Sequence, residues 1–198
     1  MLIKRGATSQ SEVIADLIFA SEPTLLSFLF GGKESCQRYL KASCAREHGQ
    51  FSANYHWIHA TQEGGVDGIC ATWLSVMPEA FQSGTLAALK DFLTTQQIIH
   101  LLAYKEVLDD CFTPPESHQL CIGHLSIRQE SRRSGVASAL LAHARDEAKA
   151  LQFTELILDV ETNNESAIAC YSKSGFEVLT QSTFEATGQR FSRMFCAV

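Results

Sequence analysis

Long apolar runs are missing from this sequence of 198 residues, since no window approaches the roughly 18 uninterrupted apolar residues that a membrane-spanning helix needs. The opening residues, MLIKRGATSQ, have no apolar stretch after their charges and so do not resemble a secretory signal. We expect a cytoplasmic protein without a membrane partner. Apolar residues still make up 45% of the chain, enough for one hydrophobic core, so we expect a single domain over residues 1–198.

Paired cysteines are missing as well. No C-x-x-C motif occurs and the number of cysteines is odd, which argues against a disulfide framework and against a zinc cluster. His56 and His59 lie three positions apart on an expected strand, so they should face opposite sides and should not share a metal. We expect no metal site, and reduced thiols at Cys36, Cys44, Cys70, Cys111, Cys121, Cys170 and Cys196.

Basic residues are fewer than acidic ones in this sequence. It has 16 Lys and Arg residues and 22 Asp and Glu residues, for a net charge of −6. Nucleic-acid binding needs a clustered basic face that neutralises phosphates. We therefore expect no nucleic-acid partner, although a local basic patch would still permit contact with an aminoacyl-tRNA. The acidic balance favours a neutral or basic small partner.

Apolar periodicity and turn residues predict alternating strands and helices. Strands are expected at residues 1–5, 54–61, 66–74, 119–127, 154–160, 176–183 and 190–197. Helices are expected from about residue 11 to 20 and at 25–30, 34–48, 78–108 (as two helices), 135–151 and 164–173. A right-handed crossover should make the strands at 119–127 and 154–160 parallel.

The stretch RRSGVAS, residues 132–138, has one glycine among small residues, between an expected strand and the start of an expected helix. The first amides of a helix have no partner inside it and, with the helix dipole, form an anion site. Gly135 would let a ligand approach the backbone closely, while Arg132 and Arg133 would add positive charge. The pattern predicts a phosphate site at the amides of Ser134, Gly135, Val136 and Ala137.

A second stretch identifies the kind of phosphate ligand. The motifs G-x-x-x-x-G-K-[ST] and G-x-G-x-x-G are both absent, so neither a Mg-nucleotide nor a dinucleotide is indicated. NESAIACYSKSGF, residues 164–176, follows the next expected strand. RRSGVA and this stretch together resemble the two signatures of the Gcn5-related N-acetyltransferase (GNAT) superfamily, [RQ]-x-x-G-x-[GA] and N-x-x-A-x-x-x-Y followed by a glycine and an aromatic. The matching positions of the second signature are Asn164, Ala167, Tyr171, Gly175 and Phe176.

The resemblance is closest over residues 119–178 and implies an α/β (α+β) fold. In such a fold a mixed, mostly antiparallel, twisted sheet of about six to seven strands is flanked by helices. This chain would have extra helical segments before and after the first hairpin. The implied acyl donor is acetyl-CoA, and no metal is required.

The resemblance also implies roles for particular residues. The strand backbone at Leu125, Ser126 and Ile127 would pair with the pantetheine amides. Asn164 and Ala167 would line the pantetheine route, and the pyrophosphate would lie at Arg132, Arg133, Ser134, Gly135, Val136, Ala137 and Ser138. The Tyr171 hydroxyl would act as general acid toward the departing thiolate, a role that suits a phenol with a pKa near 10.

The proton acceptor has more than one candidate. An alkylamine is mostly ammonium at pH 7, so a group that removes its proton is needed. Asp159 is the first candidate, because strand alternation puts it on the face opposite Leu156, Leu158 and Val160. His124, expected on one face with Ile122 and Ser126, and water are the alternatives. A covalent route through Cys170 is a lesser option.

The sequence thus predicts an enzyme that transfers an acetyl group from acetyl-CoA to a primary amine of a small molecule or peptide, by direct attack in a ternary complex. The alternative is a non-catalytic acyl-CoA-binding regulatory module of the same fold. Net charge favours a polyamine, an aminoglycoside or a protein N-terminus as acceptor, with arylamines and amino acids open. Phe28, Leu29 and Phe30 could wall the acceptor mouth, and a homodimer stays open.

Overall fold

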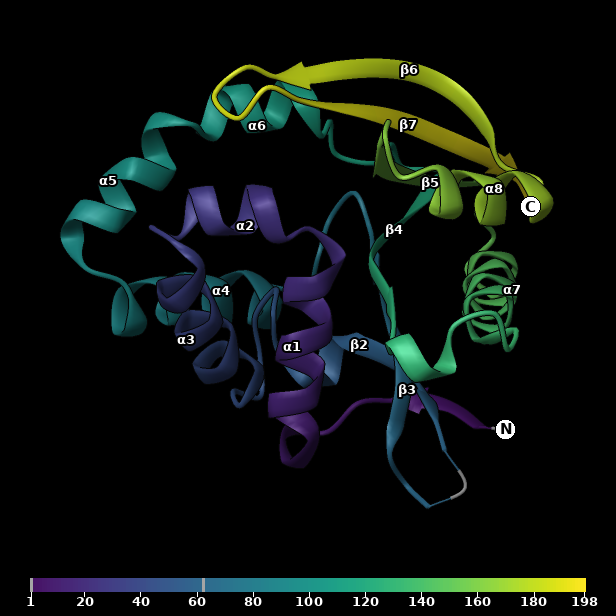
Figure 1. Cartoon of the computed structure of the whole chain (residues 1–198), viewed down its shortest axis with the longest axis horizontal. Coiled ribbons are helices and arrows are strands. Elements are labelled where there is room, and N and C mark those ends of the chain that lie inside the picture. Colours follow the sequence, from purple (N-terminus) through teal and green to yellow (C-terminus); the bar gives the residue numbers. More distant parts are fainter. Residues whose placement is uncertain (1, 62) are drawn as a thin grey trace.

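Seven strands form one sheet in the computed structural model, which describes residues 2–61 and 63–198 (Figure 1). They are β1 (Leu2–Arg5), β2 (His56–Ala60), β3 (Val66–Trp73), β4 (Gln119–Ile127), β5 (Glu155–Glu161), β6 (Glu177–Phe184) and β7 (Gln189–Ala197). Their order across the sheet is β1-β2-β3-β4-β5-β7-β6. The neighbours β4 and β5 run parallel, and the other neighbouring pairs of described strands are antiparallel. The expected mixed, mostly antiparallel sheet with a central parallel pair is confirmed.

Eight α-helices accompany the sheet in the described part of the chain. They are α1 (Ser11–Ser21), α2 (Pro23–Leu29), α3 (Lys33–Cys44), α4 (Glu79–Phe92), α5 (Thr95–Ala103), α6 (Lys105–Cys111), α7 (Val136–Ala150) and α8 (Glu165–Lys173). None of the helices in residues 2–61 and 63–198 combines the length and the apolar character needed to cross a membrane.

The helical segment between β3 and β4 differs from expectation, because it holds three helices rather than two. Leu93 is extended and interrupts the segment after α4. The Thr94 side chain then accepts a hydrogen bond from the Gln97 amide, and the Gln97 side chain bonds back to the Thr94 amide, which starts α5. Tyr104 separates α5 from α6 in a conformation that is not helical.

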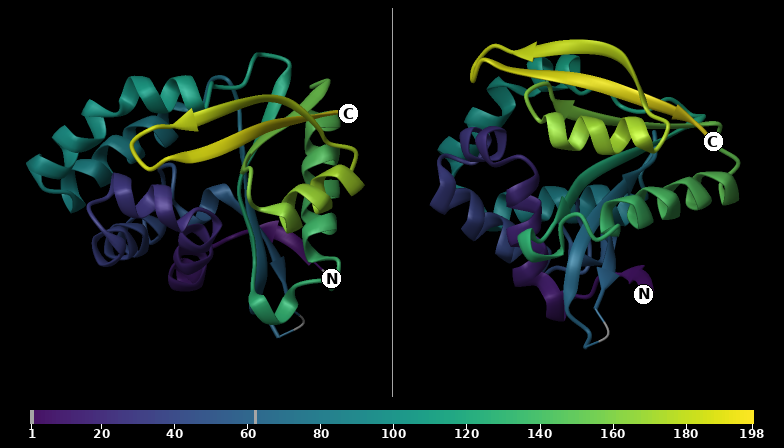
Figure 2. Two further views of the ribbon diagram at one scale, coloured as in Figure 1. Left: turned by 45° about the horizontal axis from the view of Figure 1, so that its top comes forward. Right: turned by 45° about the vertical axis from the view of Figure 1, so that its right-hand side comes forward.

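Helices cover both faces of the sheet, as the two views of Figure 2 show. On one face α1, α2 and α3 pack against the first strands in a core whose fully buried members include Ile14, Ile18, Leu40, Ile58 and Ile69. On the other face α7 and α8 pack in a second core with Leu140, Leu156, Leu158, Tyr171 and Met194. The expected alternation of β5 is confirmed for Leu156, Leu158 and Val160, which all belong to the second core.

The central parallel pair comes apart halfway along. β4 and β5 pair over four positions, from Gln119 opposite Glu155 to Ile122 opposite Leu158. Beyond this point β4 follows β3 as far as Ile127, whereas β5 follows β7 as far as Glu161. In Figure 1 β4 runs down toward the short turn before α7, while β5 stays beneath the β6–β7 hairpin. The sheet is therefore split between its two central strands.

Candidate active site

The start of α7 leaves backbone amides without a partner. Gly135 caps the helix at a φ of +89°, a left-handed conformation that glycine adopts without strain, and no side chain bonds to this end. The Ala139 N–H donates to the Gly135 carbonyl at 3.0 Å, whereas within the described residues the N–H groups of Val136, Ala137 and Ser138 donate no hydrogen bond. A Cβ on Gly135 would meet no atom within 4 Å. This helix end is therefore open and suited to an anion.

Two exposed arginines lie next to this helix start. The Arg132 Nε–H donates to the Ile127 carbonyl at 3.4 Å, and Arg133 takes a φ of +60°. The Ser134 hydroxyl donates to the Ser131 carbonyl, which closes the turn. The structure thus gathers the predicted residues 132–138 around one helix end, with positive charge beside the free amides.

The end of β4 presents a free edge on the side of the split. Ser126 pairs with Ile69 and Ile127 with Gly68, both in β3. On the opposite edge, no strand among residues 2–61 and 63–198 pairs with Leu125, Ser126 or Ile127. Backbone groups on such an edge can bond to an extended ligand that lies in the split.

Helix α8 presents Tyr171 to the split from the other side. Asn164 caps this helix, since its Oδ1 accepts hydrogen bonds from the Ala167 amide at 3.2 Å and the Ser166 hydroxyl at 3.1 Å. Tyr171 is 7% exposed and packs against Phe176, and its hydroxyl makes no hydrogen bond within the described residues. Burial raises the pKa of Tyr171, so the phenol keeps its proton at neutral pH and can donate it.

A cavity of about 840 Å³ opens where the strands separate, and we call it the central cavity. Its lining comes from β4 (residues 121–125), the end of β5 (158–161), α8, β7, and the helices α2, α4, α5 and α6. It brings together the predicted residues Leu125, Asp159, Asn164, Ala167 and Tyr171. Ser126, Ile127 and the 132–138 turn lie outside it, at the end of β4 and the start of α7.

Asp159 is held by an arginine that the sequence reasoning missed. Arg193 of β7 lies opposite Asp159 of β5, and its Nε–H and Nη2–H donate to the two carboxylate oxygens at 2.9 and 2.8 Å. The two side chains are each 14% exposed and both line the central cavity. The hydrogen bonds from Arg193 to Asp159 raise the pKa of this arginine. The pair therefore presents little net charge to the cavity.

His124 does not share a face with Ile122, because an extra residue interrupts β4. Ile69 pairs with Ser126 but Ala71 pairs with Gly123, so three steps in β4 match two steps in β3, and His124 has a φ of +49°. Ile122 belongs to the core under α7. The His124 ring instead stacks on Phe51 of the opposite core and meets the edge of Trp73. The expectation from strict alternation was wrong at this position.

A second histidine fixes the hydrogen position on His124. His56 Nδ1 lies 2.9 Å from the Ser52 carbonyl oxygen, which can only accept, so this nitrogen carries the hydrogen. In a neutral ring His56 Nε2 must then accept, and the His124 Nδ1–H donates to it at 2.9 Å. Burial lowers the pKa of His56 to about 4 and the pKa of His124 well below its usual value, so both rings are neutral at pH 7. His124 therefore bears its lone pair on Nε2.

His59, the other histidine of β2, has a different partner. Its Nδ1 lies 3.2 Å from an oxygen of Asp67, away from the His56–His124 pair. Among the described residues, no group of three or more His, Cys, Asp or Glu side chains is arranged to hold a metal ion.

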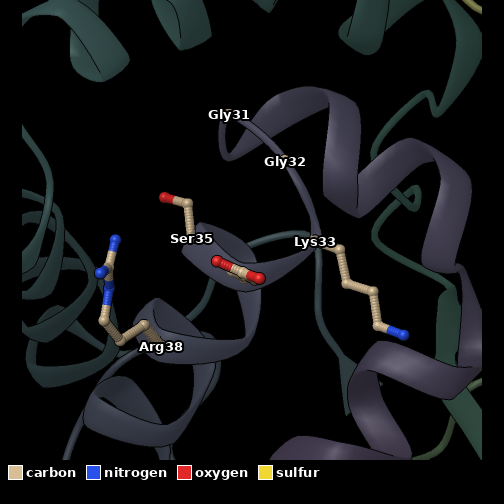
Figure 3. A pocket seen from close by; sticks show the side chains of 6 residues that line it. Gly31, Gly32, Lys33, Ser35 and Arg38 are labelled. Atoms are coloured by element: carbon tan, nitrogen blue, oxygen red, sulfur yellow. The ribbon is translucent and has the colours of Figure 1, made fainter.

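A second, shallower hollow of about 410 Å³ lies at the start of α3 (Figure 3). It is lined by Gly31, Gly32, Lys33, Glu34, Ser35 and Arg38. Figure 3 shows Ser35 and Arg38 on one side of the helix and Lys33 on the other. None of the predicted site residues contributes to it, so it is separate from the central cavity.

Comparison with known proteins gives a family model and a set of solved structures. Residues 45–176 match the model of the acetyltransferase (GNAT) family. No curated protein matches the chain. An N-acetyltransferase from Staphylococcus aureus Mu50 superposes with a TM-score of 0.72 at 15% identity, over 98% of this chain and 100% of that one.

Two further structures cover the whole of both chains. A crystal structure of an acetyltransferase has a TM-score of 0.65 and 19% identity. A ribosomal-protein-alanine N-acetyltransferase from Brucella melitensis has a TM-score of 0.55 and 14% identity. At these identities the likeness shows the shared fold, including the helices that precede residue 45.

The family model spans two thirds of the chain, from the end of α3 to the residue before β6. Both sequence signatures, at residues 132–137 and 164–176, lie inside the match. The structure places the first signature at the open start of α7 and the second at the capped start of α8, on the two sides of the split sheet. The chain therefore belongs to the acetyltransferase (GNAT) family.

Proposed function

We propose that this protein transfers an acetyl group from acetyl-CoA to a primary amine, by direct attack while both substrates are bound. Family membership supports acetyl transfer in general. One observation carries the finer proposal: β4 and β5 separate beyond Ile122 and Leu158, with the free amides of α7 following β4 and Tyr171 of α8 lining the cavity. An extended donor with a diphosphate at one end and a reactive thioester at the other suits this arrangement.

The residues along the split fit acetyl-CoA. The amides of Val136, Ala137 and Ser138 and the exposed arginines offer donors and charge for the diphosphate. The open space over Gly135 admits a bulky group. The free edge of β4 offers backbone partners for the pantetheine amides. When bound, acetyl-CoA supplies an activated thioester carbonyl.

Tyr171 is our proposed general acid. The amine lone pair forms the new C–N bond as the C–S bond breaks, and Tyr171 donates its hydroxyl proton to the departing sulfur. Because burial raises its pKa, the phenol holds this proton until negative charge develops beside it. A backbone N–H at the free edge of β4 would polarise the carbonyl oxygen.

His124 is our proposed acceptor for the proton that the amine loses. Its Nε2 bears the lone pair, and within the described residues this nitrogen has no hydrogen-bond partner. Asp159 as the base stays a prediction from sequence. Arg193 bonds to both of its oxygens, so the atoms that would take the proton are already occupied by hydrogen bonds. The hydrogen bonds therefore favour His124.

Replacing Tyr171 by phenylalanine tests the proposal. We expect Tyr171→Phe to reduce the rate of CoA release with an amine acceptor by about 100-fold, since a general acid is removed. Thermal stabilisation by acetyl-CoA should persist, because the diphosphate site is intact. Tyr55→Phe is the matched control, because Tyr55 does not line the central cavity. Stabilisation by acetyl-CoA without turnover of any amine by the wild type would instead support a non-catalytic acyl-CoA-binding module.

A further inference from the structure

The central cavity continues past Tyr171 and His124 into a region whose walls are apolar. Side chains from α2 form one wall and side chains from α4, α5 and α6 form the other. The apolar lining includes Leu26 and Leu29 of α2, Leu89 of α4, Leu101 of α5, Leu108 of α6 and, directly after α6, Phe112. The helical segment between β3 and β4, which the sequence left without a role, is thus one side of this region.

The mouth of this region is apolar too. Leu86 of α4 and Leu102 of α5 line the cavity and are also 58% and 64% exposed. Hydrogen bonds hold α5 against α2, since the Gln97 side chain donates to the Phe30 carbonyl at 3.1 Å and His100 bonds to the Phe28 carbonyl at 3.0 Å. The wall is therefore anchored, and exposed leucines at its rim favour entry of an apolar body.

The charged groups of the cavity limit the charge that a ligand can carry. Six charged side chains line it: Glu22, Lys105, Asp109, Asp159, Glu161 and Arg193. Lys105 pairs with Asp109, and Asp159 pairs with Arg193. Within residues 2–61 and 63–198, Glu22 and Glu161 have no cationic partner, although the Gln189 amide donates to Glu22 at 2.9 Å. The cavity therefore carries a small excess of negative charge and has no unpaired cation in its described lining.

The charges of the cavity lining distinguish between the classes of amine acceptor that the net charge of the chain left open. A polyamine or an aminoglycoside brings several positive charges and further polar groups. Glu22 and Glu161 can pair with at most two of these charges, and burying the remaining polar groups against leucines is costly. An amino acid brings a carboxylate, for which the described lining has no unpaired cation. A cavity of this volume also suits a small molecule, because pockets of about 300–1,000 Å³ enclose drug-sized ligands.

We propose that the acceptor is a small primary amine with one positive charge and an uncharged, apolar body, which lies between α2 and the α4–α6 segment. The amino group faces Tyr171 and His124, and the apolar body lies against the leucine walls. This inference rests on the proposed acetyl transfer and names the acceptor class for the same site.

Matched amines test the inference. In a CoA-release assay, kcat/KM for phenethylamine should exceed that for ethanolamine by about tenfold or more, because both carry one amine and only the first buries an apolar body. Spermidine, kanamycin and glycine should be poorer than phenethylamine. If any of these three, or a peptide N-terminus, is preferred over phenethylamine, the inference is overturned and acetyl transfer to amines stands.

A pair of variants on one helix tests the location. Leu102→Gln should raise the KM for phenethylamine severalfold and leave the KM for ethanolamine and for acetyl-CoA unchanged. Ile99→Gln is the matched control, since Ile99 is on the same helix and 53% exposed but does not line the cavity. Equal effects of the two variants, or none from Leu102→Gln, would overturn the location.

A binding measurement separates failure of this inference from failure of the proposed function. Calorimetric titration of phenethylamine into the CoA-bound protein should give a signal that Leu102→Gln weakens. If phenethylamine binds in this way but no acceptor releases CoA, acetyl transfer is refuted and the apolar site stands. If acceptors release CoA but phenethylamine does not bind, the apolar site is refuted.

Discussion

At the scale of single residues, hydrogen bonds determine which polar atoms of the candidate site are occupied and which are free. The Ser52 carbonyl fixes the hydrogen on His56, and His56 in turn fixes the hydrogen on Nδ1 of His124. At Asp159, Arg193 bonds to both carboxylate oxygens. The candidate that comes first from the sequence, Asp159, is thus bonded to an arginine, whereas the alternative, His124, has a free ring nitrogen.

Substitution of these residues should rank them. We expect His124→Gln to lower kcat by about 100-fold, as for loss of a general base. His56→Phe should lower kcat by a smaller factor, because the hydrogen on Nδ1 of His124 would no longer be fixed by a partner. Asp159→Asn should have less effect than His124→Gln, and acetyl-CoA affinity should be unchanged in all three. A full loss of activity in Asp159→Asn with activity retained in His124→Gln would return the base to Asp159.

The buried histidines should also make stability depend on pH. His56 has a pKa of about 4 in the folded protein and about 6.5 when unfolded, so between these values the unfolded chain binds the extra proton. Stability is therefore full above pH 6.5 and falls as the pH drops toward 4, by about 3 kcal/mol from this residue. Because burial also lowers the pKa of His124, this residue too makes the protein less stable as the pH falls. Urea unfolding at pH 7 and pH 4.5 should show this loss, and His56→Phe should shrink it; an equal pH dependence in both proteins would contradict the account.

At the scale of elements, one substitution at the start of α7 can separate the stability of the helix from its binding of acetyl-CoA. Ser138 is exposed in the first turn, where a carboxylate stabilises a helix through its dipole by about 0.3–1 kcal/mol. The same carboxylate would repel a diphosphate at the free amides. Ser138→Asp should therefore keep or raise the melting temperature while weakening acetyl-CoA binding at least tenfold.

The first turn of α5 provides the control for this charge. Gln96→Glu adds a negative charge to an exposed first turn away from the split, so acetyl-CoA affinity should not change. Similar losses in the two variants would mean that total charge, and not the α7 site, governs binding.

Elements with local signals were predicted well from the sequence. Gly135 and Asn164 mark the starts of α7 and α8, and the predicted bounds of β4 are those of the structure. The three helices between β3 and β4 had a local signal as well, because Thr94 and Gln97 have the spacing of a capping box. The start of α5 is therefore a local feature that the sequence encodes.

Features that depend on pairing between distant strands could not be predicted. The extra residue in β4 places the His124 side chain on the other face of the sheet. It is a feature of the β3–β4 register, which a prediction from strict alternation does not include. The partners of Asp159 and His124 come from β7 and β2, at sequence separations of 34 and 68 residues. Which side chains meet in the site is therefore a property of the assembled sheet.

At the scale of the whole molecule, the split sheet joins segments that are far apart in the chain. One side of the split carries β4 and the start of α7, and the other carries β5 and α8, with four paired positions between the two strands. The α4–α6 segment adds the far wall of the cavity. A ligand that lies along the split would contact both sides at once, and this gives the central claim a distinct signature.

Amide hydrogen exchange with and without acetyl-CoA tests that claim most directly. The account predicts slower exchange at Val136, Ala137 and Ser138 and along residues 125–127, with no change at the start of α3. The start of α3 is a suitable internal reference, because it is also capped by a glycine, Gly32, with open space around it. Slower exchange at α3, or none at the start of α7 under saturating acetyl-CoA, would contradict the account.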